Sequence, residues 1–126
     1  MKRLLFIYNL HSGKGLIRNH LADIIDTFNK AGYETVVYST QERADATRLA
    51  KELGASYDLV VCSGGDGTLS EVLDGVMTID EKRRPKIGYI PAGSTNDYAY
   101  SLGLPSQMKR CANVIAAVSY THLRAH

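Results

Sequence analysis

The sequence predicts an α/β domain with three layers (α/β/α), in which a mainly parallel sheet lies between helices. Short apolar runs alternate along the chain with longer segments whose apolar residues recur at helical spacing. This β-α-β-α order is typical of a parallel sheet whose crossover helices cover both faces. Residues 58–62, DLVVC, hold a continuous apolar run, as expected of a strand that is buried on both faces.

Four short runs are expected to form the strands. They are residues 3–8, 34–38, 58–62 and 86–90. The first is a compact apolar run and the second is rich in β-branched residues, and both patterns favour strands. Pro91 closes the fourth run, and each of the others leads into a polar or glycine-containing segment that ends the strand.

The segments between these runs are expected to be helices. The expected helices are residues 16–31, 43–53, 69–77, 95–102 and 107–118. In the first three, apolar side chains recur along one stripe, as they do in a helix that packs one face against a sheet. Gly32 and Gly54 follow the first two helices, and glycine is the residue that most often ends a helix.

Size and composition indicate one ordinary soluble domain. A chain of 126 residues with 44% hydrophobic and 22% charged residues can bury a core. A net charge of +2 is too small to indicate nucleic acid as a partner. The two cysteines show neither metal-ligand spacing nor a disulfide framework, and no apolar run is long enough to span a membrane. We expect a cytoplasmic protein that meets a membrane only at its surface.

Residues 1–118 are expected to form the domain, and residues 119–126, SYTHLRAH, are a tail without an apolar period. The connection before the fourth strand carries a basic cluster, formed by Lys82, Arg83, Arg84 and Lys86. Such a cluster can give weak, reversible contact with anionic lipids. A charge run is more often a solvated loop, and this second interpretation is preferred here.

The most informative motif is the glycine-rich turn at residues 63–71, SGGDGTLSE, which follows the third expected strand. Consecutive glycines let backbone N–H groups point together, and such a nest binds anions, aided by the dipole of the following helix. In an open α/β sheet, ligands bind at the carboxyl ends of the strands. The motif therefore predicts a phosphate site, although Thr68 and Glu71 also match a capping box at the start of a helix.

Asp66 stands among these glycines, where a carboxylate repels a phosphate unless something compensates. It can hold Mg²⁺, directly or through water, or it can accept the proton of an attacking hydroxyl. The structural alternative is an aspartate that bonds its own backbone in an Asx-type turn. Asp66 is therefore the candidate catalytic residue, and the metal ligands stay unassigned.

A second polar turn, residues 9–15 (NLHSGKG), follows the first expected strand. It is not a P-loop, because Gly15 replaces the Ser or Thr that would hold Mg²⁺ and no glycine stands five residues before Gly13. Asn9 and Ser12 can supply side-chain hydrogen bonds to a nucleotide. The alternative is a plain connecting loop.

A third turn, residues 91–97 (PAGSTND), follows the fourth expected strand. Ser94 and the three residues after it are all suited to cap a helix, and only one cap is needed. The surplus of polar side chains indicates contacts to a ligand.

Together the three turns resemble the diacylglycerol kinase catalytic family, and the resemblance covers nearly the whole chain to about residue 118. Residues 63–76, SGGDGTLSEVLDGV, are similar to the GGDGT signature of diacylglycerol and sphingosine kinases, which NAD kinases and phosphofructokinases share more distantly. Residues 87–105, IGYIPAGSTNDYAYSLGLP, resemble a segment of this family that NAD kinases do not carry in this form. Leu10 stands where the family usually has proline, and Ser94 where many members have threonine.

The resemblance implies a fold like that of phosphofructokinase and NAD kinase, with the nucleotide in a cleft between this domain and a second, β-rich domain that is absent here. The nucleotide-binding residues that it implies are Asn9, Ser12, Gly13, Thr40, Gly65, Asp66, Gly67, Thr68, Glu71 and Ser94. In the sphingosine kinase branch, the aspartate that matches Asp66 is proposed as the base. The second domain would supply much of the lipid site, a proposed catalytic acid and a Mg²⁺ site.

The function implied is that of a lipid kinase that uses ATP and Mg²⁺ and transfers the γ-phosphoryl group to a lipid hydroxyl, such as that of diacylglycerol. The partners would be the nucleotide and a lipid at the membrane surface, and a homodimer is left open. This chain would be the nucleotide-binding half, inactive alone. Two alternatives remain. Residues 91–97 argue against a kinase of NAD or sugar phosphates from the same superfamily, and the intact GGDGT motif argues against a non-catalytic nucleotide-binding module.

Overall fold

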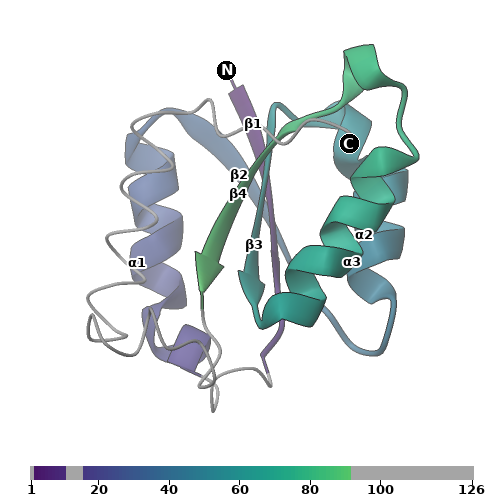
Figure 1. Ribbon diagram of the computed structural model, residues 1–126. Helices are drawn as coiled ribbons and strands as arrows, with labels where there is room; N and C mark the ends of the chain where they lie inside the picture. The colour runs from purple at the N-terminus through teal and green to yellow at the C-terminus, as the bar shows by residue number, and fades with distance from the viewer. Residues whose placement is uncertain (1, 11–15, 92–126) are drawn as a thin grey trace.

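The computed structural model describes residues 2–10 and 16–91 of the chain. In chain order the elements are β1 (Lys2–Tyr8), α1 (Leu16–Lys30), β2 (Tyr33–Ser39), α2 (Asp45–Leu53), β3 (Leu59–Gly64), α3 (Asp66–Met77) and β4 (Lys86–Pro91), with short 3₁₀ helices at Gly54–Ser56 and Glu81–Arg83 (Figure 1). The expected alternation of strands and helices is confirmed over these residues. The expected helices at 95–102 and 107–118 and the tail lie outside them.

The described strands form one parallel sheet in the order β2-β1-β3-β4. The chain runs from β1 to β2 on one side and then crosses to β3 on the other side of β1. The strand order therefore reverses between β1 and β3, and ligands of open α/β sheets bind outside the carboxyl ends of such a pair. Tyr8, Ser39 and Ser63 are in register at this end of the sheet, which we call the carboxyl edge.

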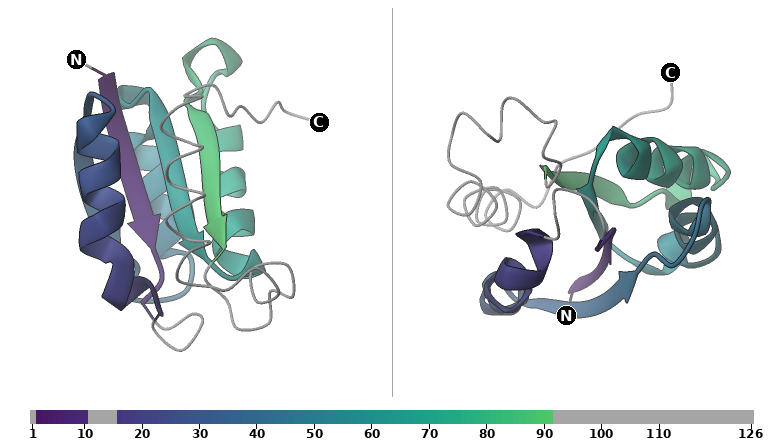
Figure 2. Two further views of the ribbon diagram at one scale, coloured as in Figure 1. Left: turned by 90° about the vertical axis from the view of Figure 1, so that its left-hand side faces the viewer. Right: turned by 90° about the horizontal axis from the view of Figure 1, so that it is seen from below.

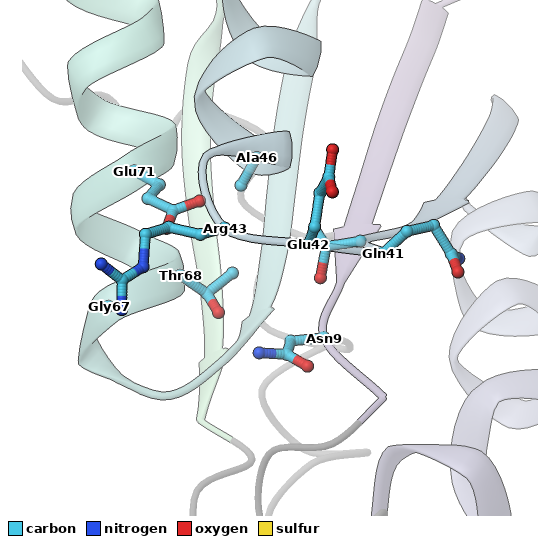
Figure 3. Close-up of a pocket in the computed structure, with 9 residues that line it drawn as sticks. Asn9, Gln41, Glu42, Arg43, Ala46, Gly67, Thr68 and Glu71 are labelled. Atoms are coloured by element: carbon cyan, nitrogen blue, oxygen red, sulfur yellow. The ribbon is translucent and has the colours of Figure 1, made fainter.

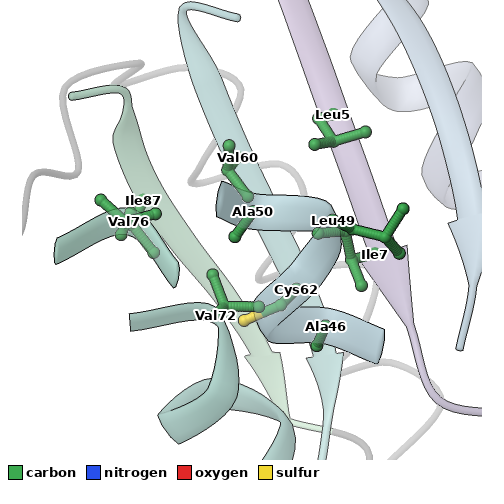
Figure 4. Packing of buried hydrophobic residues seen from close by; sticks show 10 residues of the cluster. All are labelled: Leu5, Ile7, Ala46, Leu49, Ala50, Val60, Cys62, Val72, Val76 and Ile87. Carbon is green, nitrogen blue, oxygen red and sulfur yellow. The ribbon is translucent and has the colours of Figure 1, made fainter. Parts of the chain in front are cut away.

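Helices cover both faces of the sheet, with α1 on one face and α2 and α3 on the other (Figures 1 and 2). Successive strand residues point to opposite faces, so each strand contributes to two cores. The strand residues that pack with α1 are Leu4, Phe6, Leu59, Val61 and Ile90. Those that pack with α2 and α3 are Leu5, Ile7, Val60, Cys62 and Ile87 (Figure 4). Residues 59–62 are at most 1% exposed, which confirms a strand buried on both faces.

Helices α2 and α3 approach each other closely at Gly75. A Cβ on Gly75 would meet the Thr47 carbonyl oxygen and would lie 2.8 Å from the Ala50 Cβ. Thr47 also donates a hydrogen bond of 2.8 Å from its hydroxyl to the Glu71 carbonyl. The two helices therefore form one layer in which α2 is joined to the middle and the end of α3. No helix among the described residues has the length and apolar character that crossing a membrane requires.

Helix α3 begins at Asp66 rather than at the expected residue 69. Gly65 is the N-cap residue, and the N–H groups of Thr68 and Leu69 donate to its carbonyl at 3.1 and 3.4 Å. The capping-box interpretation of Thr68 and Glu71 is wrong, because no side chain caps this helix and Thr68 lies within its first turn. Much of the glycine-rich motif is thus the first turn of a helix rather than a loop.

Helix α2 begins at Asp45 rather than at the expected residue 43. Ala44 has a φ of 72°, a left-handed conformation that a right-handed helix does not include. The Asp45 carboxylate accepts hydrogen bonds from the backbone N–H groups of Gln41 and Glu42, at 2.7 and 3.1 Å. Such side-chain bonds compete with helix formation. Residues 43 and 44 therefore belong to the loop between β2 and α2.

The opposite end of the sheet, which we call the amino edge, is held together by polar contacts around Arg3. The Arg3 backbone N–H donates to the Asp58 carboxylate at 2.7 Å, and the guanidinium lies 3.0 Å from the Glu34 carboxylate. The guanidinium also lies 4.4 Å from the centroid of the Tyr57 ring and donates to the Ser56 carbonyl at 3.1 Å. These contacts tie β1 to β2 and to the segment before β3.

Candidate functional site

The carboxyl edge brings together the residues that follow three of the strands. Asn9 follows β1, Thr40 follows β2 and Gly65 follows β3. The Thr40 N–H donates to the Tyr8 carbonyl at 2.9 Å. The Asn9 N–H donates to the Ser63 carbonyl at 3.0 Å. The hydrogen bonds of the sheet thus continue into the turns and fix where each turn begins.

A cleft of about 300 Å³ opens at this edge, between the β2–α2 loop and the start of α3 (Figure 3). Its lining consists of Asn9, Thr40, Gln41, Glu42, Arg43, Ala46, Gly67, Thr68 and Glu71. Ligand pockets in proteins usually have volumes of roughly 300–1,000 Å³. The cleft is therefore large enough for part of a ligand of nucleotide size.

The structure brings together many of the residues that the sequence predicted for nucleotide binding. Those that line the cleft are Asn9, Thr40, Gly67, Thr68 and Glu71. Gly65 stands directly before α3, outside the lining, and Asp66 is the first residue of α3. The remaining predicted residues, Ser12, Gly13 and Ser94, lie outside the described residues.

Gly64 is the last residue of β3, and neighbouring protein atoms leave no room for a Cβ at this position. A Cβ at this position would meet the Thr68 hydroxyl oxygen, and it would lie 2.8 Å from the Thr68 Cβ and 3.3 Å from the Asn9 Cβ. The Gly64 carbonyl accepts a 2.9 Å hydrogen bond from the Tyr89 hydroxyl on β4. Thr68 and Asn9 can therefore lie directly against the backbone of β3.

Gly65 and Gly67 differ from Gly64, because a Cβ at either position would have no neighbour within 4 Å among the described residues. Gly65 also has a φ of −85°, which any residue can adopt. Neither glycine has a positive φ, so backbone strain does not require a glycine at either position. Their lack of a side chain instead leaves open space in front of the first turn of α3, where N–H groups have no partner within the helix.

Thr68 combines burial with an unused hydroxyl. The residue is 7% exposed, and no described residue forms a hydrogen bond with its side chain. The residue lines the cleft, and its oxygen is not one of the fully buried side-chain atoms that lack a partner. Figure 3 shows the hydroxyl on the side of the cleft that Asn9 also borders. Thr68 therefore offers a hydrogen bond to a ligand in the cleft.

The wall opposite α3 is the β2–α2 loop, of which the sequence analysis found only Thr40. Gln41, Glu42 and Arg43 also line the cleft, and Arg43 extends across it toward the side of α3 (Figure 3). No described residue forms an ion pair with Arg43. Sequence reasoning missed these residues because it searched for glycine turns. The available signal was a run of polar side chains directly after a predicted strand.

The shape of this loop depends on Asp45. The backbone N–H of Gln41 is the main cause that lowers the pKa of the Asp45 carboxyl below its ordinary value, and the N–H of Glu42 and the Arg48 cation lower it further. The Asp45 and Arg48 side chains lie 3.6 Å apart. Asp45 is therefore charged at neutral pH, and its hydrogen bonds to the loop are charge-assisted.

The two walls offer complementary chemistry to a ligand. The start of α3 presents N–H groups without helical partners, the Thr68 hydroxyl and the positive end of the helix dipole, a combination that binds phosphate. Arg43 adds a positive charge from the opposite wall. Asn9 and Glu71 supply oxygens that can accept hydrogen bonds from hydroxyl groups. Within residues 2–10 and 16–91, no group of three or more His, Cys, Asp or Glu side chains could hold a metal ion, so these residues do not form a metal centre by themselves.

The fold and the cleft define an open α/β domain with a candidate ligand site at the carboxyl edge of its sheet. The family model described as "Diacylglycerol kinase catalytic domain" matches residues 3–124. The chain therefore belongs to the diacylglycerol kinase catalytic domain family, and the resemblance carried by the GGDGT motif is confirmed.

Named relatives and solved structures agree with this family. The chain is 43% identical over 122 residues to a diacylglycerol kinase of Bacillus subtilis (strain 168), covering 94% of this chain and 40% of the relative. It is 44% identical over 115 residues to a diacylglycerol kinase of Staphylococcus epidermidis (strain RP62A), covering 90% and 36%. A solved structure of a putative diacylglycerol kinase from Bacillus anthracis str. Sterne matches with a TM-score of 0.77 and 30% identity, covering 93% of this chain and 42% of that chain. The chain thus spans about two fifths of the length of these proteins.

Proposed function

We propose that this chain is the nucleotide-binding part of an ATP-dependent lipid kinase, which transfers the γ-phosphoryl group of ATP to the hydroxyl of a lipid such as diacylglycerol. The observation that carries the proposal is the cleft at the carboxyl edge, where the Thr68 hydroxyl and the Arg43 cation border the space at the start of α3. Phosphoryl transfer needs positioning and charge stabilisation more than covalent chemistry. The family of the chain favours a lipid acceptor.

The start of α3 is proposed to hold the phosphate groups. The open space at Gly65 and Gly67 lets phosphate oxygens approach the backbone N–H groups closely. Thr68 donates its unused hydroxyl to one of these oxygens, and Arg43 balances their charge from the other wall. A side chain at Gly65 or Gly67 would fill this space without disturbing the protein itself.

The nucleoside is proposed to lie along the rest of the cleft, in contact with Asn9, Thr40 and Glu71. Ser12, Gly13 and Ser94 complete the proposed set of contacts. Asp66, the first residue of α3, is the proposed base that accepts the proton of the lipid hydroxyl. Mg²⁺ enters the proposal only as the companion of the ATP phosphates, whose charge it neutralises, because the described residues form no metal centre of their own.

A second wall is needed for turnover. We propose that residues 1–118 are one domain of a longer enzyme and that the remaining length of the relatives corresponds to a second domain that closes the site. A kinase must keep water from the transferring phosphoryl group, since hydrolysis otherwise competes. A single wall cannot exclude water, so we expect weak nucleotide binding and no turnover from the 126-residue chain alone.

The lipid is proposed to reach the site from a membrane surface at the carboxyl edge. The basic cluster around residues 82–86 does not support an anchor there, because it precedes β4 and so lies toward the amino edge. The Arg84 guanidinium donates to the carbonyls of Ile79 and Met77, at 2.9 and 3.0 Å. Arg84 is thus engaged at the end of α3, which supports the interpretation of this segment as a solvated connection.

The test uses the full-length protein, labelled ATP and diacylglycerol in detergent micelles. Thr68→Val keeps the shape of the side chain and removes the hydroxyl, and we expect it to raise the KM for ATP about tenfold, equivalent to about 1.4 kcal/mol. Thr27→Val is the matched control, because the Thr27 hydroxyl only donates to the Asp23 carbonyl within α1. Failure of the wild-type protein to phosphorylate diacylglycerol would refute the proposed activity. An unchanged KM in Thr68→Val would refute the proposed site.

A further inference from the structure

The β2–α2 loop is an irregular segment that nonetheless forms one whole wall of the cleft. Thr40, Gln41, Glu42 and Arg43 all line the cleft, and residues 41–44 are exposed. Apolar packing therefore does not determine the shape of this loop. Among the described residues, Ala44 is the one non-glycine with a positive φ, a conformation that other contacts must hold in place.

Two sets of hydrogen bonds hold the loop. At its start, the Thr40 N–H donates to the Tyr8 carbonyl at 2.9 Å. In its middle, the Asp45 Oδ2 atom accepts from the N–H groups of Gln41 and Glu42, at 2.7 and 3.1 Å. Asp45 is 9% exposed, so water competes little for these bonds. The carboxylate thus fixes the backbone of the two residues that precede Arg43 and Ala44.

Asp45 does not itself line the cleft, and its side chain is directed into the loop and toward Arg48. Its effect on a ligand must therefore pass through the loop residues that do line the cleft. Arg43 is the most consequential of these, because a long cation helps to bind phosphate only where its backbone is held in place. The Asp45 charge is already balanced by two N–H groups and by Arg48 at 3.6 Å, which leaves Arg43 available to an anion.

We propose that Asp45 is a positioning residue for the nucleotide: it holds the β2–α2 loop in the shape in which Thr40 and Arg43 face the cleft. This inference rests on the proposed function, since it takes the occupant of the cleft to be a nucleotide. The competing explanation is that Asp45 only stabilises the first turn of α2, where an acidic side chain favours the helix dipole. The two explanations predict different effects of substituting Asp45. A positioning role predicts a change in ATP affinity, whereas a role in helix stability predicts a change in the melting temperature alone.

The variants are Asp45→Ala and Asp45→Asn in the full-length protein. Asparagine keeps an oxygen that can accept both loop N–H groups, whereas alanine keeps none. We expect Asp45→Ala to raise the KM for ATP about tenfold and to change kcat less than about threefold, because the loop affects binding before chemistry. We expect Asp45→Asn to keep most of the wild-type affinity for ATP. The KM for diacylglycerol is expected to stay unchanged in both variants.

Glu52→Gln is the matched control. Glu52 is a carboxylate on the same helix and lies 3.5 Å from the same Arg48, but no hydrogen bond or ion pair joins it to the described residues of the loop. We expect its KM for ATP to equal that of the wild-type protein. A rise in KM in Glu52→Gln equal to that in Asp45→Ala, or an unchanged KM in Asp45→Ala with a lowered melting temperature, would overturn the inference in favour of a role in helix stability.

Amide hydrogen exchange of Gln41 and Glu42 separates a failure of this inference from a failure of the proposed function. We expect both amides to be protected in the wild-type chain and in Asp45→Asn, and to exchange at least about tenfold faster in Asp45→Ala. Exchange that is equally slow in Asp45→Ala would overturn the positioning role whatever the enzyme does. A protein with the expected exchange pattern but without ATP-dependent activity would refute the proposed function and, with it, the assignment of the nucleotide as the occupant.

Discussion

The two edges of the sheet carry polar side chains for opposite purposes. At the amino edge, Arg3 is joined to Asp58, Glu34 and Tyr57, so the polar groups satisfy one another. At the carboxyl edge, no described residue pairs with the Thr68 hydroxyl or the Arg43 cation. Polar groups that pair internally contribute to stability, whereas polar groups that line a cleft without a partner stay available to a ligand. The comparison indicates where in this domain a ligand belongs.

The largest effect is expected from Gly65→Val at the carboxyl edge. A Cβ at Gly65 meets no atom of residues 2–10 or 16–91 within 4 Å, and the backbone is in an ordinary extended conformation, so the variant should fold. The valine would occupy the space proposed for phosphate, and we expect a loss of ATP affinity on the order of 100-fold in the full-length protein. Calorimetric titration with ATP checks the affinity, and circular dichroism checks the fold. Wild-type affinity in a folded variant would remove the phosphate role from this turn.

Gly64→Ala should instead lower the stability of the fold, because the new Cβ would clash with the protein's own atoms rather than with a ligand. The new Cβ would meet the Thr68 hydroxyl and approach the Asn9 Cβ to 3.3 Å, and overpacking of this kind costs about 1–3 kcal/mol. Gly67→Ala is the control, since its Cβ meets open space and alanine favours a helix by roughly 0.5–1 kcal/mol over glycine. Urea denaturation of both variants measures the difference. Equal stabilities would contradict the close packing of Thr68 on Gly64.

At the amino edge, Arg3→Ala should lower stability and leave ATP binding unchanged. The variant removes a half-exposed ion pair, worth about 0–1 kcal/mol, and a cation–π contact, worth about 0.5–1 kcal/mol, so we expect a loss of about 0.5–2 kcal/mol. Arg18→Ala on α1 is the control, because no described residue pairs with that side chain. Denaturation and ATP titration are measured on the same samples. Weaker ATP binding in Arg3→Ala would show that the two edges are not independent.

The smallest effect is expected for the change in folding stability as the pH is lowered. Because the pKa of Asp45 is lowered in the folded chain, chiefly by the Gln41 N–H, its charged form stabilises the native state above the ordinary carboxyl pKa. This contribution is lost as the pH falls below that ordinary value and through the lowered one. Asp45→Asn should therefore have a shallower acid limb of the stability curve than the wild-type chain. Superimposable limbs would show that Asp45 has the same pKa in both states.

The sequence predicted the layers and strands well, because apolar periodicity reports directly which residues are buried on which face. It missed the start of α3, since glycine and aspartate are weak helix formers and the sequence pattern assigned the glycine-rich residues to a loop. It missed the start of α2 for the opposite reason. The residues just before Asp45 suit a helix, but the Asp45 carboxylate accepts hydrogen bonds from the N–H groups of Gln41 and Glu42 and holds this segment as a loop. Arg43 was overlooked as a cleft residue because the sequence placed it at the start of a helix, whereas it belongs to the β2–α2 loop.

The central claim is that the carboxyl edge, and not the amino edge, binds the nucleotide. The most direct measurement is a titration of the isotopically labelled 126-residue chain with ATP and Mg²⁺, followed by amide chemical shifts, which report weak binding as well as tight binding. We predict shift changes at Asn9, Thr40 and Thr68 at millimolar ATP, with Arg3 and Glu34 unchanged. Shift changes centred on Arg3 and Glu34, or none at the carboxyl edge at saturating ATP, would contradict the account.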